Sequence, residues 1–142
     1  MAAESAVAHY NSFAPEYDAW FDGEGQLIFA TELNALEEIL PALPRPWLEV
    51  GIGSGRFALA LGVETGIDLS LKMAEIARSR GLKVILARGE KLPFPEGSFG
   101  VAFLLFTRCF VDSIAGRFAG GIPRSGSGRH GGGGGLERQS FR

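Results

Sequence analysis

The 142-residue chain has little of several features that mark specialised classes of protein. It contains one cysteine, Cys109, so no disulfide can form within it. Its longest apolar runs, such as VAFLLF, are far shorter than the roughly 20 residues that a membrane helix needs. Its first residues show no basic stretch followed by an apolar one, as a secretion signal would. The formal charge of -2 leaves no basic surplus for nucleic acid. We therefore expect a cytoplasmic protein with no membrane or nucleic-acid partner.

What the sequence does have is enough apolar residues, 46% of the chain, to bury the core of one domain. The charge is unevenly distributed along it. Residues 113–142 hold five arginines and one glutamate, so residues 1–112 carry the remaining charge of -6. The composition therefore predicts a mildly acidic domain over residues 1–112, followed by a tail of different character.

Helical and strand patterns alternate along the predicted domain. Ser70 suits the start of a helix, and Gly62 and Gly81 suit helix ends. Apolar residues on one helical face predict a helix that Pro41 ends; they are Phe29, Leu33, Leu36 and Leu40. The predicted strands cover residues 47–50, the segment that ends at Asp68, residues 82–86 and residues 99–106, and further helices are expected over residues 55–62 and 70–81. This alternation predicts an α/β fold with a doubly wound, mostly parallel sheet.

The stretch WLEVGIGSGRF, residues 47–57, predicts a ligand-binding turn between a strand and a helix. A nucleoside triphosphate would require Gly-Lys-Ser/Thr after the turn, where this chain has Arg56 and Phe57. A dinucleotide would require a glycine at position 56, but the third glycine falls one residue early, at Gly55. Glu49 beside the loop would also repel a pyrophosphate. Both phosphate ligands are therefore disfavoured.

A ligand with an amino-acid moiety and a ribose, but no phosphate, fits the same residues. In S-adenosyl-L-methionine the ammonium group can meet Glu49 and the carboxylate can meet backbone N–H groups of the loop. Asp68 follows the next strand and is placed to accept the ribose hydroxyls. Each feature alone is also compatible with a structural role, as a tight turn or a helix entry. Together, at consecutive strand ends, they favour a methyltransferase.

Five segments in order resemble the class I S-adenosylmethionine-dependent methyltransferases, particularly the type 11 branch. YNSFAPEYDAWF resembles the lid helix of that family, expected here over residues 9–22. LEVGIGSGRF, GIDLSLKMAEIAR and GEKLPFPEGSF resemble its first three motifs, and FTRCFVD the segment after its fourth strand. The resemblance spans roughly residues 9–112. It implies a Rossmann-like fold and cofactor contacts from Tyr10, Tyr17, Glu49, Gly51, Gly53, Gly55, Asp68, Leu69, Met73, Gly89, Glu90, Phe106 and Thr107.

Two positions depart from the family pattern. Arg88 stands where the family often has an acid that binds the adenine amine, so we expect adenine recognition here to rest on the backbone alone. Gly100 gives SFG where SFD is usual, which weakens the start of a strand.

Methyl transfer is an in-line displacement that depends on positioning and desolvation, so it requires no nucleophile from the protein. We identify no catalytic residue. His9 is a candidate general base, although a surface role suits it better, and Cys109 suits a buried apolar position. Tyr10 and Tyr17 fit either a lid over the cofactor or the packing of a helix. We expect no metal, a small-molecule methyl acceptor that the sequence does not name, and an oligomeric state that it does not specify.

Residues 113–142 do not fit the family. Ten of these 30 residues are glycine, and strand or helix periodicity is lost, as in a flexible low-complexity tail. Rewriting GRFAGG and SGRHGGGG in GC-rich codons shifted by one base gives Ala-Ala-Ser-Arg-Glu-Ala and Pro-Gly-Gly-Met-Val-Val-Val, which resemble the next helix and strand of the family. We therefore hypothesise a reading-frame shift near residues 112–116, which leaves the C-terminal strands missing or scrambled.

Two other functions stay open at this point. A chain that lacks its last strands could be an inactive remnant that binds the cofactor weakly or not at all. A nicotinamide-dependent reductase would also use a glycine loop, but Arg56 at the third-glycine position disfavours it.

Overall fold

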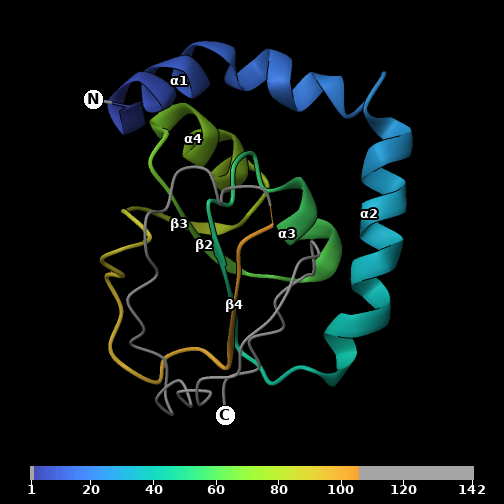
Figure 1. The fold of residues 1–142 in the computed structure, drawn as a ribbon, viewed down its shortest axis with the longest axis vertical. Helices are drawn as coiled ribbons and strands as arrows, with labels where there is room; N and C mark the ends of the chain where they lie inside the picture. Colours follow the sequence, from blue (N-terminus) through green and yellow to red (C-terminus); the bar gives the residue numbers. More distant parts are fainter. Residues whose placement is uncertain (1, 106–142) are drawn as a thin grey trace, which may run out of the picture.

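The computed structural model describes residues 2–105 of the chain, which form a parallel sheet covered by helices (Figure 1). The helices are α1 (Ala2–Trp20), α2 (Gln26–Ile39), α3 (Arg56–Leu61) and α4 (Leu71–Ser79), and a 3-10 turn, η1 (Leu40–Ala42), follows α2. The strands are β1 (Trp47–Val50), β2 (Thr65–Asp68), β3 (Lys83–Leu86) and β4 (Val101–Phe103).

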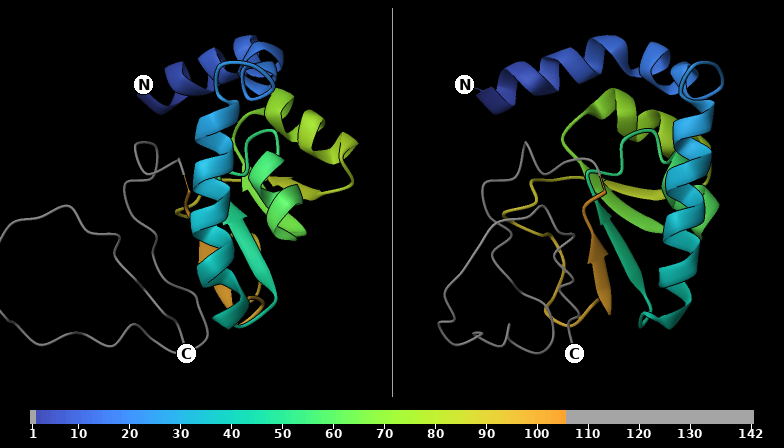
Figure 2. Two further views of the ribbon diagram at one scale, coloured as in Figure 1. Left: turned by 90° about the vertical axis from the view of Figure 1, so that its right-hand side faces the viewer. Right: turned by 45° about the vertical axis from the view of Figure 1, so that its right-hand side comes forward.

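The four strands lie in the order β3-β2-β1-β4, and every neighbouring pair is parallel. In this register Val50 pairs with Ile67, and Asp68 pairs with Leu86. The carboxyl ends of β1, β2 and β3 therefore meet at one edge of the sheet, beneath α1 (Figures 1 and 2). This edge is where ligands bind in doubly wound sheets.

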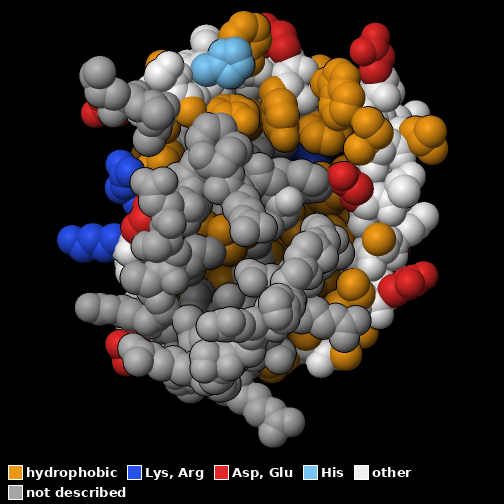
Figure 3. Space-filling view, in the orientation of Figure 1, with side chains coloured by type: hydrophobic (Ala, Val, Ile, Leu, Met, Phe, Trp, Pro, Cys, Tyr) orange, Lys and Arg blue, Asp and Glu red, His pale blue; other side chains and the backbone are white. Residues whose placement is uncertain are grey.

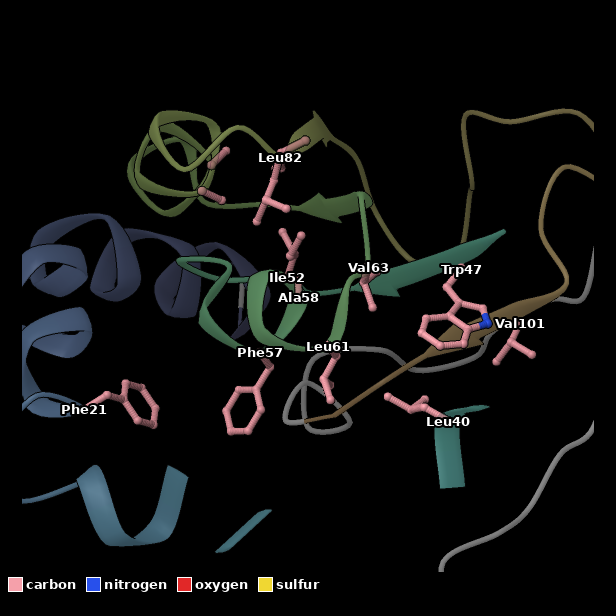
Figure 4. Packing of buried hydrophobic residues seen from close by; sticks show 13 residues of the cluster. Phe21, Leu40, Trp47, Ile52, Phe57, Ala58, Leu61, Val63, Leu82 and Val101 are labelled. Atoms are coloured by element: carbon pink, nitrogen blue, oxygen red, sulfur yellow. The ribbon is translucent and has the colours of Figure 1, made fainter. Parts of the chain in front are cut away.

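The two faces of the sheet are covered by different elements. One face packs against α2, α3 and α4 in a single apolar cluster, part of which Figure 4 shows: Phe21 lies opposite Phe57, and Leu40 lies beside Trp47. The predicted apolar face is confirmed for Phe29, Leu33 and Leu36 of α2, which pack against this cluster, and the fourth predicted residue, Leu40, joins it from η1. On the other face Leu48, Val50 and Ile67 pack against residues of the loop that follows β3 and of β4.

Several predicted boundaries were wrong within the described residues, most clearly those of the lid helix and of the strand expected over residues 99–106, which ends at Phe103. The lid helix, expected over residues 9–22, spans Ala2–Trp20, because its first turns are rich in helix-forming alanine. The strand expected from residue 99 begins at Val101. Gly100 is held outside it, where its N–H donates to the carbonyl oxygen of Pro46 and a Cβ would collide with the Pro44 carbonyl oxygen. A side chain would not fit there, which explains glycine at this departure from the family pattern.

The predicted helix signals after β1 and β2 are confirmed. Gly62 caps α3 with a φ of 72°, and the Ser70 hydroxyl accepts a hydrogen bond from the Met73 N–H at 3.2 Å. The predictions that concern Phe106, Thr107, Cys109 and the tail lie outside the described residues.

Candidate functional site

A cavity lies at the carboxyl ends of β1, β2 and β3, between the sheet and α1. In Figure 3 hydrophobic side chains gather along α1 at the top of the molecule. Most residues predicted to contact the cofactor line this cavity. They are Tyr10, Tyr17, Glu49, Gly51, Gly53, Asp68, Leu69, Met73, Gly89 and Glu90.

The glycine loop forms one wall of the cavity, and its shape is fixed by backbone hydrogen bonds to β2. The N–H groups of Gly51 and Ile52 both donate to the Ile67 carbonyl oxygen, at 2.8 and 3.0 Å. Gly53 has a φ of 56°, in the left-handed region that favours glycine, and its N–H donates to Asp68 Oδ2 at 2.8 Å. The loop is therefore tied to the carboxylate that is predicted to hold the ribose.

Gly55, the third glycine of the motif, does not line the cavity. Its φ is 80°, and a Cβ there would collide with the Leu82 side chain and press against Ala77. The glycine thus lets α3 begin close to α4 and β3. In this structure Gly55 allows close packing beneath the loop and forms no part of the cavity wall.

Two carboxyl groups form the polar centre of the cavity. Glu49 on β1 is 3% exposed, and its Oε2 has no hydrogen-bond partner among the described residues. Burial, followed by the nearby Asp68 carboxyl, raises the pKa of Glu49 to about 8. Burial also raises the pKa of Asp68, against the lowering effect of hydrogen bonds from Ser70 and Gly53. A buried acid without a partner suits a cationic ligand.

Helix α1 covers the cavity and is fastened at two points. Near its middle, Asn11 Oδ1 accepts hydrogen bonds from the Ser70 hydroxyl at 2.7 Å and from the Lys72 N–H at 3.2 Å. Near its C-terminal end, Asp18 pairs with Arg56 and Arg80. Tyr10 and Tyr17 each directly precede one of these residues and contact each other edge to face, at 6.1 Å between ring centroids. Both tyrosines line the cavity, and their role as a lid over a cofactor stays a prediction.

The sequence reasoning missed the polar contacts of α1. Asn11 and Asp18 belong to no predicted site, and Arg56 serves in the sequence pattern only to disfavour nucleotide ligands. A signal did exist, because Asp18 and Asp22 lie one helical turn apart in YDAWFDG and so present two carboxylates on one side of the chain. Their arginine partners are 34 to 62 residues away and could not be read from local pattern.

His9 is exposed on α1, where its ring packs against Phe13 at 4.5 Å between centroids, and it does not line the cavity. The Arg88 side chain is exposed, and its Nε lies 3.6 Å from Oε2 of Glu90. Among residues 2–105 no group of three or more His, Cys, Asp or Glu is arranged to hold a metal ion. Within the same range no helix is both long and apolar enough to cross a membrane.

A parallel sheet with a glycine loop after β1 and acids at the ends of β1 and β2 defines a Rossmann-like, nucleoside-binding class of domain. The family model described as "Methyltransferase domain" matches residues 48–119, just over half of the chain. The chain belongs to this methyltransferase family, and the resemblance predicted from its motifs is confirmed.

Two curated relatives are themselves uncharacterised. A protein of Mycobacterium tuberculosis is 44% identical over 119 residues, which cover 83% of this chain and 41% of the relative. A protein of Methanocaldococcus jannaschii is 44% identical over 90 residues, which cover 63% of this chain and 42% of the relative. The chain thus spans less than half the length of these relatives.

Solved structures confirm the predicted fold class. A SAM-dependent methyltransferase of Thermotoga maritima, described as a possible histamine N-methyltransferase, superposes with a TM-score of 0.67 at 38% identity. The match covers 74% of this chain and 49% of that one. A putative S-adenosyl-L-methionine-dependent methyltransferase of Methanococcus maripaludis gives a TM-score of 0.62 at 14% identity and covers 73% and 53% of the two chains, a likeness of fold alone.

Proposed function

We propose that the chain binds S-adenosyl-L-methionine in the cavity under α1 and serves methyl transfer to a small-molecule acceptor. The observation that carries this proposal is Glu49, a buried carboxyl with an unpartnered oxygen at the wall of the cavity. A buried acid of this kind is costly unless a cation completes it. The ammonium group of the cofactor supplies that cation, whereas a pyrophosphate supplies none.

The other predicted contacts divide the cavity into two ends. Asp68 binds the ribose hydroxyls while its carboxylate oxygens keep their bonds to Gly53 and Ser70, since each carboxylate oxygen can accept more than one hydrogen bond. Leu69, Met73 and the Gly89–Glu90 segment lie on the nucleoside side. Tyr10 and Tyr17 close the cavity from α1, where aromatic rings attract a sulfonium.

When bound, S-adenosyl-L-methionine supplies a methyl group on a positively charged sulfur. The residues of this chain hold the reacting groups in line and exclude water, and the transfer needs no nucleophile from the protein. We assign no general base. Phe106 and Thr107, predicted to lie near the methyl group, are part of this proposal on the strength of the motif only.

Calorimetry of the full chain with S-adenosyl-L-homocysteine tests cofactor binding. We expect Asp68→Asn and Glu49→Gln each to weaken binding by roughly ten- to a hundredfold, because each removes a charge-assisted hydrogen bond. Glu64→Gln is the matched control, since it removes an exposed carboxylate just before β2 and should change nothing.

Two outcomes would favour the alternatives. Tight binding of NAD, with none of S-adenosyl-L-homocysteine, would replace the proposal with a reductase. Cofactor binding without methyl transfer would indicate a non-catalytic remnant. Transfer of a radiolabelled methyl group from S-adenosyl-L-methionine to a panel of small amines provides that assay. Histamine belongs in the panel because a similar structure is described as a possible histamine N-methyltransferase.

We also infer that the methyltransferase domain occupies residues 1–112, with α1 as its lid, and that the reading frame changes near residues 112–116. The break in composition supports this division, and it falls close to the end of the family match at residue 119. A fresh nucleotide read across codons 108–142 tests it. An unbroken frame that encodes the printed tail would contradict the inference.

A further inference from the structure

Asp18 joins three separate elements that surround the cavity. Its carboxylate accepts hydrogen bonds from Arg56 Nε at 2.8 Å and from Arg80 Nη1 and Nη2 at 2.8 and 2.6 Å. Its side chain is 15% exposed, so these pairs are largely shielded from water. Burial alone would raise the pKa of Asp18, but the hydrogen bonds from Arg80 and Arg56 outweigh burial and hold it well below its usual range. The carboxylate is therefore charged at any working pH.

Arg56 is the arginine that lines the cavity. Its guanidinium is shared between Asp18 and Asp22, whose carboxylate accepts from Nη1 at 2.8 Å and from Nη2 at 2.7 Å. With Arg80 the cluster holds two positive and two negative charges, so it is neutral as a whole. Removing the charge of Asp18 would leave a net positive charge at the wall of the cavity.

The interior of the cavity is acidic beside this neutral cluster. Glu49, Asp68 and Glu90 line it, and Arg56 is the only basic residue among the described lining residues. Arg80 does not line the cavity, but its Nη1 donates to the Ser54 carbonyl oxygen in the glycine loop at 2.6 Å. Besides these acids, the charge that a ligand meets depends on how fully Asp18 and Asp22 neutralise Arg56 and Arg80.

We propose that Asp18 is a specificity-determining residue: by neutralising Arg56 it makes the cavity select a cofactor with a positively charged sulfur. This inference rests on the proposed function and deepens it. Asp18 does not touch the ligand and acts through Arg56. The bonds by which Asp18 fastens α1 also neutralise Arg56, so this cation at the cavity wall does not repel the ligand.

Two ligands separate this role from simple anchoring of α1. S-adenosyl-L-methionine and S-adenosyl-L-homocysteine share the amino acid, ribose and adenine, and differ by one methyl group and one positive charge on sulfur. A looser lid would weaken both to a similar degree. A net positive charge in the cluster would weaken the charged ligand more, so the ratio of the two dissociation constants reports the charge effect.

The test is calorimetry of the full chain with both ligands at low ionic strength. We expect Asp18→Asn to lower the preference for S-adenosyl-L-methionine over S-adenosyl-L-homocysteine by roughly three- to tenfold, as an added charge across a partly shielded cavity would. High salt should make this change in ligand preference smaller, because it screens the added charge. Glu75→Gln breaks the exposed Lys72–Glu75 pair on α4 and should leave the ratio as it is.

A second variant keeps the test decisive if Asp18→Asn does not fold. Arg56→Gln removes the cation itself, so it should raise the preference for S-adenosyl-L-methionine. In the double variant Asp18→Asn/Arg56→Gln the wild-type preference should return, even if both ligands bind more weakly.

Equal weakening of both ligands by Asp18→Asn, or a lower preference in Arg56→Gln, would overturn the proposal and leave Asp18 as an anchor of α1. A wild-type chain that binds neither ligand would instead overturn the proposed function. The two failures are therefore distinguishable.

Discussion

The floor and the roof of the cavity are built in different ways. The floor, formed by the strand ends and the glycine loop, is held by backbone hydrogen bonds and by side chains such as Val50 and Ile67 that are almost wholly buried. The roof, formed by α1, is fastened through polar side chains at Asn11 and Asp18, and it leaves Phe13, Tyr17 and Trp20 partly exposed. The floor therefore depends on local sequence and close packing, whereas the roof depends on a few long-range contacts that can be broken one at a time.

A side-chain atom added at a tightly packed glycine of the floor should have the largest effect on stability. Gly55→Ala places a Cβ against Leu82 and forces a left-handed residue to be non-glycine. We expect a loss of about 2–4 kcal/mol in the free energy of unfolding, measured with urea. Gly81→Ala is the control, because Gly81 has a φ of 86° but no neighbour within reach of a Cβ, and it should cost about 1 kcal/mol. Equal losses would show that packing at Gly55 is unimportant.

The stability that Glu49 and Asp68 contribute in the floor should depend on pH, whereas the stability that Asp18 contributes in the roof should not. The pKa of Glu49 is raised from 4.5 to about 8, so the folded, ligand-free protein keeps a proton in this window that the unfolded chain has lost. Stability must then fall as pH rises from about 4.5 to about 8, by at most about 1.4 kcal/mol per pH unit. The raised pKa of Asp68 acts in the same direction.

Urea unfolding at several pH values between about 5 and 8 measures this slope. Glu49→Gln should flatten it, because glutamine cannot titrate. Asp18 in the roof has a pKa held well below its usual range and should contribute no slope there. Binding of a cationic cofactor should release the Glu49 proton, which calorimetry in two buffers of different ionisation enthalpy would detect. A slope unchanged by Glu49→Gln would contradict the assignment.

The smallest effect should come from releasing one point of the roof. Asn11→Ala removes the acceptor for Ser70 and Lys72, and we expect a loss of about 1 kcal/mol together with faster amide hydrogen exchange in α1. Ser12→Ala, the neighbouring position, breaks bonds only to carbonyl oxygens of α1 itself and should change stability by a few tenths of a kcal/mol. Faster exchange in β1 as well would show that floor and roof unfold together.

The same contrast explains what the sequence could predict. Apolar runs that end in glycine or acid mark β1 and β2, and parallel strands bring their ends together, so Glu49 and Asp68 could be placed in one site beforehand. Asp18 could not be paired with Arg56 and Arg80, because the three lie in separate elements and no local period connects them. The role of Gly55 was also hidden, since only the positions of Leu82 and Ala77 show that it serves packing.

Arg80 connects the floor and the roof directly. Its guanidinium holds Asp18 of α1 and the Ser54 carbonyl oxygen of the loop at the same time. Arg80 follows α4, so its bond to the loop does not depend on the position of α1. When α1 moves away from the cavity, we expect Arg80 to lose the Asp18 carboxylate but to keep the Ser54 carbonyl oxygen, so the loop should hold its shape as the cover opens.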